Sequence, residues 1–343
     1  MMEKSPGIKE WRELYKLIVE LKEIAPWQWL EEQDLIAVQN PETKEIGFVS
    51  VMGAIGEHHA IAVYLGEKGY YRFRDFQQST PDTFSFQKIL EMPQLQASFE
   101  DRGMLHEKDR EIIKNLSLTF RGKQSWPMFR SYKPGFFPWY LNSSEARFLK
   151  YALEQTIDVS LRAKKDRSLL RPYDDATYLL RKMVKKGNTF SWQDSTWKES
   201  PPAPHKIEPQ IDMIAIERLK KVFPQKITLE IDVFMSPQPV QEKGARPYYP
   251  YVLMLIDANN GMIVDHQLIP PLPDLESMWE KIPSLVADIF AKRSLLPERI
   301  LVSSDFLYQF LYHLSDNLNI SVEFLEELPN VNEARISFMK YLQ

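Results

Sequence analysis

A proline-rich stretch divides the chain and determines how it can be organised. Residues 198–210, KESPPAPHKIEPQ, hold four prolines in thirteen positions and show no periodic spacing of apolar residues. Such a composition is typical of an extended linker between folded domains. A chain of 343 residues is also too long for one ordinary hydrophobic core. We therefore predict an α+β domain over 1–198, a linker over 199–210 and a second domain over 211–343.

The composition narrows the classes of protein to which the chain can belong. The sequence contains no cysteine, which excludes disulfides, cysteine-ligated zinc, iron–sulfur clusters and thiol nucleophiles, and favours a reducing, cytoplasmic location. The N-terminal residues are predicted to form a charged amphipathic helix, unlike a signal peptide or a membrane span. The part from Lys206 onward has 19 acidic and 13 basic residues. This acidic half is poorly suited to hold phosphate backbones by itself.

The N-terminal half carries the patterns of both helices and strands. Apolar residues at helical spacing predict a first helix that ends near Pro26, with Trp11, Leu14, Tyr15, Ile18 and Leu21 on its buried face. Asn142 followed by Glu145 is a capping-box pattern, so a long helix is predicted to begin there. Strands are expected within 34–53 and 94–101, and 58–66 is expected to be either a third strand or a step from a strand to a helix. A short helix is expected over 107–116, and a hairpin over 177–192 with Gly187 and Asn188 in its turn.

The order of elements after the linker is more specific. After a short helix within 210–223, three strands are expected first, followed by alternating helices and strands, which gives the order βββαβαβα. Pro283 interrupts the first long helix of this series, and a kink is expected there. The strands lie over 227–234, within 249–271 (two strands), and over 299–304 and 320–327; the helices lie over 275–293, 306–318 and 331–342.

This order resembles the ribonuclease H-like fold, a three-layer α/β fold with a mixed sheet shared by ribonuclease H, retroviral integrases and many transposases. The resemblance covers residues 226–343. In that family an aspartate lies in the middle of the first strand, a second acid follows the fourth strand, and a third often lies on a later helix. Asp232 in TLEIDVF, Asp305 in ILVSSDF and Glu333 in PNVNEARI occupy these places. The resemblance implies that these three carboxylates are catalytic and that Asp232 and Asp305 bind Mg²⁺.

Carboxylates at these places suit a Mg²⁺-dependent phosphodiesterase that acts on nucleic acid. Two Mg²⁺ ions about 3.5 to 4 Å apart hold the attacking and leaving oxygens of a phosphodiester, and these ions prefer carboxylate oxygens as ligands. Side chains alternate along a strand, so Asp232 shares one face with Glu230 while the apolar residues between them share the other. Asp232 is therefore able to emerge toward a site, and we expect the strand that carries it to lie beside the strand over 299–304, which would bring Asp232 and Asp305 together.

Each acid also has a structural alternative. Asp305 precedes an apolar helix and is a natural N-cap. Glu333 lies three residues after Asn330, which is a capping-box arrangement. Asp232 can pair with a nearby Lys or Arg on the sheet. Together these alternatives favour a noncatalytic protein whose domains serve binding or regulation, with the phosphodiesterase as a second hypothesis.

Residues 121–140, RGKQSWPMFRSYKPGFFPWY, are a candidate binding segment because they combine four basic and seven aromatic residues without an acid. Single-stranded nucleic acid is bound by such mixtures, since bases stack on aromatic rings while Arg and Lys neutralise phosphates. The phosphate contacts would be Arg121, Lys123, Arg130 and Lys133, and the stacking residues Trp126, Phe129, Tyr132 and Trp139. The alternative is a proline-rich loop whose aromatic side chains cover a hydrophobic core. Single-strand binding is the third hypothesis.

Other motifs give little support to further activities. His58 and His59 are adjacent on an expected strand and point to opposite faces, so they cannot easily share a metal ion. The sequence has neither a Gly-rich phosphate loop nor a dinucleotide fingerprint, and it has no Gly-x-Ser-x-Gly elbow. Nucleotide-cofactor enzymes and serine hydrolases of that kind are therefore disfavoured, and Mg²⁺ is expected only for the phosphodiesterase.

The whole chain is also similar to bacterial two-domain proteins of unknown function. Two stretches carry this similarity, WRELYKLIVELKEIAPWQWLEEQDLIAVQNP over 11–41 and PERILVSSDFLYQFLYHLSDNL over 297–318. The similarity implies a prokaryotic cytosolic protein and adds no activity.

Overall fold

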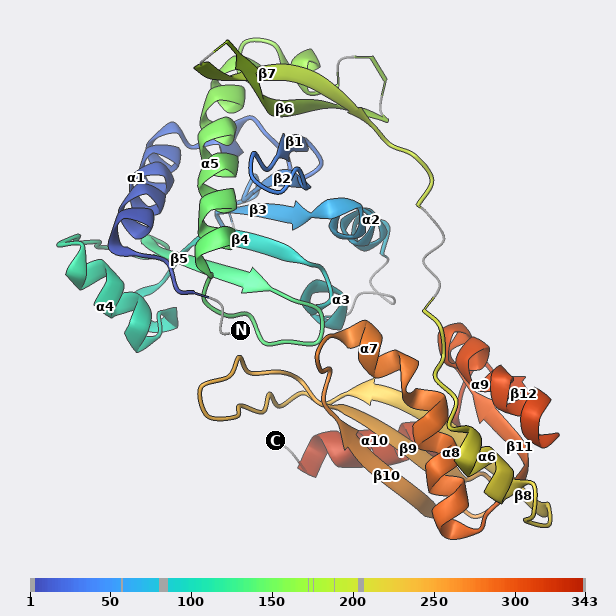
Figure 1. Ribbon diagram of the computed structural model, residues 1–343. Helices are drawn as coiled ribbons and strands as arrows, with labels where there is room; N and C mark the ends of the chain where they lie inside the picture. The colour runs from blue at the N-terminus through green and yellow to red at the C-terminus, as the bar shows by residue number, and fades with distance from the viewer. Residues whose placement is uncertain are drawn as a thin grey trace. The chain divides into compact units, whose positions relative to one another are not determined.

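The computed structural model describes residues 4–56, 58–79, 86–171, 173–174, 176–187, 189–202 and 207–341. Contacts divide the chain into two compact units, shown as ribbons in Figure 1. The N-terminal unit comprises Met1–Lys133 and Pro138–Ala203, and the C-terminal unit comprises Pro134–Phe137 and Pro204–Gln343. Residues 203–206 of the expected linker, Asn188 of the expected hairpin turn and Glu57 beside the histidine pair lie outside the described residues.

A seven-stranded sheet forms the centre of the N-terminal unit. The strands lie in the order β5-β4-β3-β2-β1-β6-β7. β1 and β6 are parallel and the other neighbours are antiparallel, so the sheet is mixed. The bounds are β1 Ile36–Gln39, β2 Ile46–Met52, β3 Ala60–Leu65, β4 Gln94–Glu100, β5 Trp126–Tyr132, β6 Thr177–Lys186 and β7 Thr189–Lys198.

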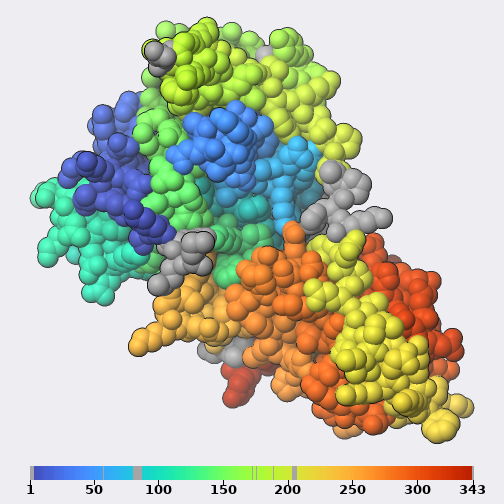
Figure 2. All heavy atoms as spheres, in the orientation of Figure 1, coloured from blue at the N-terminus to red at the C-terminus, as the bar shows by residue number. Residues whose placement is uncertain are grey.

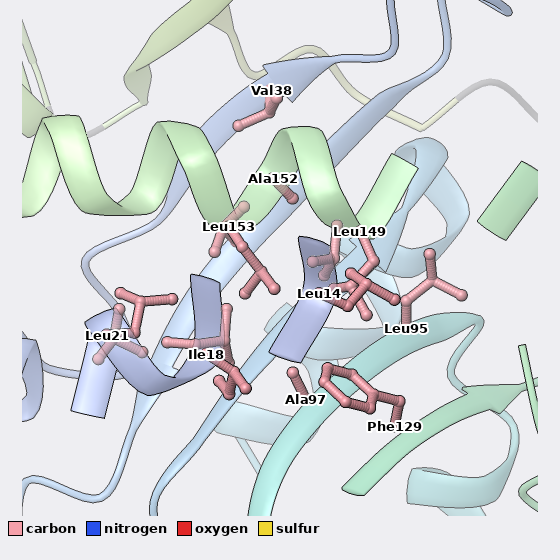
Figure 3. Packing of buried hydrophobic residues seen from close by; sticks show 14 of the residues in the cluster. Leu14, Ile18, Leu21, Val38, Leu95, Ala97, Phe129, Leu149, Ala152 and Leu153 are labelled. Atoms are coloured by element: carbon pink, nitrogen blue, oxygen red, sulfur yellow. The ribbon is translucent and has the colours of Figure 1, made fainter. Parts of the chain in front are cut away.

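Two long helices, α1 (Ile8–Ile24) and α5 (Ser143–Ala163), cover one face of this sheet (Figure 1). The predicted apolar stripe of α1 is confirmed, since all five of its residues are buried. Asn142 is the N-cap of α5, and its side chain accepts a hydrogen bond from the backbone N of Glu145, as the capping box predicts. Figure 3 shows the core between these helices and the sheet, in which Leu14 and Ile18 of α1 lie near Leu149 and Leu153 of α5.

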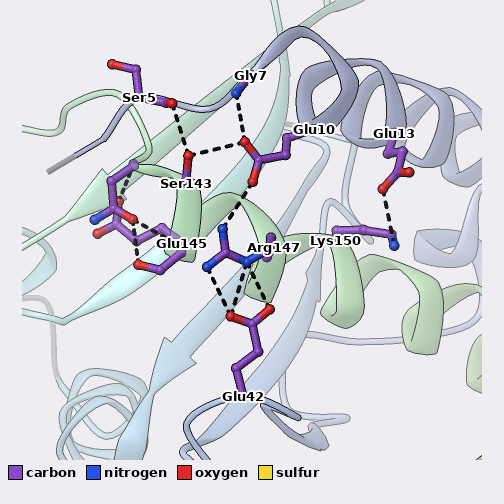
Figure 4. Close-up of polar contacts among 11 residues, drawn as sticks. Ser5, Gly7, Glu10, Glu13, Glu42, Ser143, Glu145, Arg147 and Lys150 are labelled. Carbon is purple, nitrogen blue, oxygen red and sulfur yellow. Dashed lines mark hydrogen bonds and ion pairs between the residues drawn. The ribbon is translucent and has the colours of Figure 1, made fainter. Parts of the chain in front are cut away.

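Ion pairs also join α1 and α5 at the surface. Figure 4 shows Arg147 of α5 between Glu10 and Glu42, with Nη1 3.2 Å from Glu10 Oε1 and Nε 2.9 Å from Glu42 Oε1. Lys150 Nζ lies 3.2 Å from Glu13 Oε2. These side chains are partly exposed, so each pair adds little to stability compared with the apolar core beneath it.

Shorter helices complete the N-terminal unit. α2 (Gly66–Gln77) follows β3 directly and packs on the opposite face of the sheet, where Tyr70 and Phe73 join a second apolar cluster. The sequence left 58–66 open between a strand and a strand-to-helix step, and the second interpretation is correct. The other elements are α3 Phe86–Leu90, α4 Glu107–Asn115, and the 3₁₀ helices η1 Pro26–Gln28, η3 Arg102–Met104 and η4 Arg167–Leu170.

The C-terminal unit is built on a mixed five-stranded sheet in the order β10-β9-β8-β11-β12. β8, β11 and β12 are parallel, whereas β9 is antiparallel to both β8 and β10. The predicted sequence of three strands followed by alternating helices and strands is present. The strands are β8 Gln225–Met235, β9 Tyr251–Asp257, β10 Ile263–Ile269, β11 Pro297–Val302 and β12 Ser321–Phe324.

Helices cover both faces of this second sheet. The helix expected over 275–293 is two helices, because α7 ends at Glu280 and Pro283 lies in the first turn of α8. One face packs against α6 Met213–Leu219, α7 Leu275–Glu280, α8 Ile282–Arg293 and α9 Asp305–Leu318. The opposite face packs against α10 (Pro329–Tyr341), whose Val331 joins Phe234, Val252, Met254 and Ile256 of the sheet.

Four residues from the middle of the N-terminal sequence, Pro134–Phe137, belong to the C-terminal unit. The backbone N of Phe137 donates to Pro247 O at 3.0 Å, and the backbone N of Tyr249 donates to Gly135 O at 2.9 Å. Gly135 has a φ of +82°, and a Cβ atom there would lie 2.7 Å from Pro271 Cβ. Only glycine fits at this position without a shift of its neighbours.

Candidate functional site

The strand that carries Asp232 lies in the middle of the C-terminal sheet, beside the strand that leads to Asp305. β8 pairs in parallel with β11, with Ile300 opposite Leu229 and Leu301 opposite Glu230. The two parallel strands therefore end at the same edge of the sheet, where β11 gives way to α9. The expected neighbourhood of these two strands is confirmed.

Glu230, two residues before Asp232 on the same face of β8, is fixed by the start of α10. Its side chain is buried, with 3% of the residue exposed. Glu230 Oε1 accepts a hydrogen bond from Asn330 Nδ2 at 2.7 Å, and Oε2 accepts one from the backbone N of Val331 at 2.8 Å. Asn330 also donates to Ala258 O at 3.3 Å. A carboxylate at a helix N-terminus is stabilised by the free backbone N–H groups and the helix dipole, so Glu230 anchors α10 to the sheet.

Asp232 is also covered by α10. Its side chain is 13% exposed, and Arg335 Nη1 lies 3.9 Å from Asp232 Oδ2. Burial raises the pKa of Asp232, while a hydrogen bond with the backbone of Val233 and the charge of Arg335 act in the opposite direction. The Arg or Lys partner that the sequence suggested for Asp232 is therefore Arg335.

The other two acids lie elsewhere on the C-terminal unit. Asp305 is exposed and is the first residue of α9, which packs on the sheet face opposite to Asp232. The expected N-cap role of Asp305 is wrong, because Ser304 is the N-cap and its Oγ accepts from the backbone N of Leu307 at 3.3 Å. Glu333 is exposed on α10. Its expected capping box is wrong as well, since α10 begins at Pro329 and the Asn330 side chain binds Glu230.

The geometry of these acids limits what they can bind. Within the described part of the chain, no group of three or more His, Asp or Glu side chains is placed so that it could hold a metal ion. Glu230 uses both carboxylate oxygens for α10, and the only charged group in contact with Asp232 among the described ion pairs is a cation. These contacts suit structural roles for the two acids of β8.

The aromatic and basic segment 121–140 is not a continuous loop, because β5 occupies Trp126–Tyr132. Phe129 and Arg130 are buried, with 2% and 4% exposed. Arg130 binds both carboxylate oxygens of Asp109 in α4, at 2.9 and 2.6 Å. Neither residue is available to a ligand in this structure, so their expected contacts with bases and phosphates are corrected to roles in the core and in a buried ion pair.

The remaining residues of that segment differ in exposure. Arg121 and Lys123 are exposed, whereas Trp126, Tyr132, Lys133 and Trp139 are partly buried. Trp126 packs against the core, and the Tyr132 hydroxyl donates to Gln96 Oε1 at 2.9 Å. The backbone of Trp139 pairs with Ser131. Trp126 and Phe129 thus follow the alternative that the sequence left open, in which aromatic side chains of this segment cover the core.

The adjacent histidines have different partners. His58 Nε2 lies 2.8 Å from Glu100 Oε1, and this hydrogen bond raises the pKa of His58. The ring of His59 stacks on Trp27 with 4.4 Å between centroids. Burial lowers the pKa of His59. The two rings thus contact different groups, a carboxylate for His58 and an indole ring for His59.

One pocket could not be anticipated from the sequence. It is an open pocket of about 560 Å³ in the N-terminal unit, formed where the loop before β1 meets the end of α2. Its residues come from two separate parts of the chain and match no motif. They are Glu32, Gln33, Arg74, Phe76, Gln77, Gln78 and Ser79.

Comparisons with known proteins give domain families without an assigned activity. No helix in the described residues has the length and apolar character needed to cross a membrane. A comparison with curated proteins finds no match. A family model described as a domain of unknown function (DUF7309) matches residues 11–181, and a second domain of unknown function (DUF6930) matches residues 215–339. The chain is thus a two-domain protein in which one domain of unknown function is followed by another.

Proposed function

We propose that this is a noncatalytic binding or regulatory protein whose C-terminal unit has a ribonuclease H-like fold without its metal chemistry. The strand order β10-β9-β8-β11-β12, with β9 antiparallel, supports this fold, as do helices on both faces of the sheet. The similarity to bacterial two-domain proteins and the cysteine-free sequence support a bacterial, cytoplasmic protein.

The observation that carries this proposal is the way α10 occupies the acidic face of β8. A metal ligand needs free carboxylate oxygens in a field that attracts cations. Glu230 already accepts two hydrogen bonds from α10, and Asp232 has the guanidinium of Arg335 at 3.9 Å. Both contacts favour a structural role and oppose the approach of a second cation.

A Mg²⁺-dependent phosphodiesterase is the second candidate, with Asp232, Asp305 and Glu333 as its carboxylates. One observation favours it, namely that β8 and β11 are parallel neighbours. The ends of parallel strands at one sheet edge are a common place for ligands. Asp232 would have to exchange Arg335 for a metal ion, and the side chain of Glu333 would have to turn toward the sheet.

Cleavage assays distinguish the two candidates. The full chain is incubated with labelled single-stranded and duplex oligonucleotides in Mg²⁺ or Mn²⁺, and compared with Asp232→Asn and Asp305→Asn. Asp316→Asn, which changes another exposed carboxylate of α9, is the control. We expect the same background in all four proteins. Metal-dependent cleavage that both site variants lose and the control keeps would establish the phosphodiesterase instead.

A further inference from the structure

The hairpin of β6 and β7 continues beyond the rest of the N-terminal sheet. β7 is the last strand of that sheet, and β6 pairs with β1 at Leu180 and Arg181. From Lys182 to the turn, the strand pairs of the described residues join β6 only to β7, from Lys182 opposite Gln193 to Lys186 opposite Thr189. We call residues 182–187 and 189–193 the basic ribbon. Figure 1 shows this hairpin at the edge of its unit, and Figure 2 shows its yellow-green atoms at the surface.

The basic ribbon carries positive charge that the fold does not neutralise. The sequence over 182–193, KMVKKGNTFSWQ, contains three lysines and no acid. Lys185 and Lys186 are exposed and Lys182 is partly exposed, and within the described residues none of them pairs with a carboxylate. The next acid along β7, Asp194, is held by Arg162 and Arg181. The lysines at the end of the ribbon are therefore available to bind an anion.

The same ribbon presents an aromatic ring to solvent. Phe190 is 65% exposed and lies opposite Lys185, whose Nζ is 5.9 Å from the centre of the ring. Two residues further along the same face, Trp192 is partly buried, and its ring lies 6.1 Å from that of Tyr151 in α5. Near the turn of the ribbon, the ring of Phe190 and the lysines are thus exposed, and the ring of Trp192 is packed near Tyr151 of α5.

Lysines alone have a structural explanation, because charged side chains on an edge strand prevent the edges of two sheets from pairing. That explanation does not account for Phe190, which exposes a large apolar ring at the most solvated part of the strand. In the described part of the ribbon Phe190 is the only large apolar side chain that is exposed, which is too little area for a membrane surface or a stable protein interface. An aromatic face beside ammonium groups suits a base stacked next to its phosphates.

We propose that the basic ribbon binds single-stranded nucleic acid, with Phe190 stacking on a base and Lys182, Lys185 and Lys186 contacting the backbone phosphates. This inference rests on the proposed binding function and names its partner. It replaces segment 121–140, where Phe129 and Arg130 are buried, with a surface on which ring and charge are both exposed. The balance of charge supports this choice, because the part before Lys206 has 30 basic and 28 acidic residues, whereas the part from Lys206 onward has 13 basic and 19 acidic residues.

The test measures fluorescence anisotropy of labelled single-stranded oligonucleotides of mixed sequence with the full chain across a salt series. Phe190→Ala is expected to weaken binding about ten-fold with an unchanged salt slope, because it removes stacking and no charge. The triple change of Lys182, Lys185 and Lys186 to Ala is expected to lower the slope of log K against log salt by about 2, since each lost phosphate contact on a single strand contributes about 0.7.

A matched control removes charge from the competing segment. Arg121→Ala with Lys123→Ala alters two exposed basic residues and is expected to leave affinity close to that of the wild type. All variants change exposed or partly exposed side chains, and circular dichroism with thermal unfolding confirms that each is folded. The inference is overturned if the wild type binds no single strand, if it prefers duplex, if both ribbon variants bind as tightly as the wild type, or if only the control loses affinity.

Failure of the ribbon proposal can be distinguished from failure of the proposed noncatalytic function. Cleavage of the oligonucleotide in Mg²⁺ that depends on Asp232 would overturn the noncatalytic proposal, while the effects of Phe190→Ala on binding in EDTA would still decide on the ribbon. Binding that persists in the ribbon variants without cleavage would overturn the ribbon and leave the noncatalytic binding function in place.

Discussion

Glu230 in the central strand of the C-terminal sheet and Asn330 at the start of α10 are joined by a hydrogen bond of 2.7 Å across 100 positions of sequence. The same carboxylate accepts from the backbone N of Val331 at 2.8 Å. One buried side chain on the sheet thus anchors the start of α10.

Replacing Glu230 by Ala is expected to destabilise the protein by about 2–4 kcal/mol, because it leaves the buried N–H of Val331 without its acceptor, removes one of the two acceptors of the Asn330 amide and opens a cavity. Urea unfolding followed by circular dichroism measures this change. Glu333→Ala, at an exposed position of the same helix, is the control and is expected to change stability by less than about 0.5 kcal/mol. Equal losses in both variants would contradict the anchoring role of Glu230.

The ion pair between Asp109 and Arg130 in the N-terminal unit leads to a second prediction. Their side chains are only 6% and 5% exposed. Arg130→Met alone is expected to cost about 3–5 kcal/mol, because it leaves a buried carboxylate without its partner. Arg130→Met with Asp109→Leu is expected to be less destabilised than Arg130→Met alone, since two apolar side chains need no partner. Denaturant unfolding of Arg130→Met and of the double variant checks the order, and a double variant no more stable than Arg130→Met alone would refute it.

A third prediction concerns the pH dependence that Asp232 contributes. Burial raises the pKa of this carboxyl in the folded state. Folding therefore favours the protonated acid, and this contribution is fully present below the unfolded pKa and is lost as the pH rises through the folded pKa. Asp232→Asn removes the titration, so its stability relative to the wild type should increase from about pH 4 to pH 7. Chemical unfolding of both proteins over this range is the measurement. A constant difference would show that Asp232 does not titrate in this way.

Gly135 provides a prediction about the backbone of the C-terminal unit. Gly135→Ala is expected to cost about 2–4 kcal/mol, because an L residue is strained at a φ of +82° and its Cβ would lie 2.7 Å from Pro271 Cβ. Gly244→Ala separates the two causes, since Gly244 has a φ of +80° with no atom within 4 Å of the added Cβ. Thermal unfolding should show a clearly smaller loss for Gly244→Ala. Similar losses of stability in Gly135→Ala and Gly244→Ala would show that the contact with Pro271 does not contribute to the cost of Gly135→Ala.

Local patterns in the sequence predicted much of the fold. The spacing of Leu14, Ile18 and Leu21 and the pair of Asn142 and Glu145 are sufficient to define α1 and the start of α5, because both signals lie within a few residues of sequence. The order of the elements also predicted that β8 and β11 are neighbouring strands. α2 was only partly anticipated, since Gly66 directly follows a buried strand.

The contacts of the candidate site depend on partners that are distant in sequence. The pattern placed Glu230 and Asp232 on one face, but it gave no sign that α10 covers this face through Asn330 and Arg335. The sequence suggested that Arg130 is a cation at the surface, because its partner, Asp109, lies 21 residues earlier in a separate helix. Charge and aromatic content are visible in a sequence, whereas burial and pairing depend on tertiary packing.

The central claim is that the acidic face of β8 serves to hold α10 and does not bind metal ions. The most direct measurement is a crystal structure of the full chain soaked in Mn²⁺, with anomalous difference maps to locate the ion. We expect Arg335 beside Asp232, Glu230 bonded to Asn330 and Val331, and no anomalous peak within ligand distance of Asp232. A Mn²⁺ peak bound by Asp232 and Asp305 together, with Arg335 displaced, would contradict the claim.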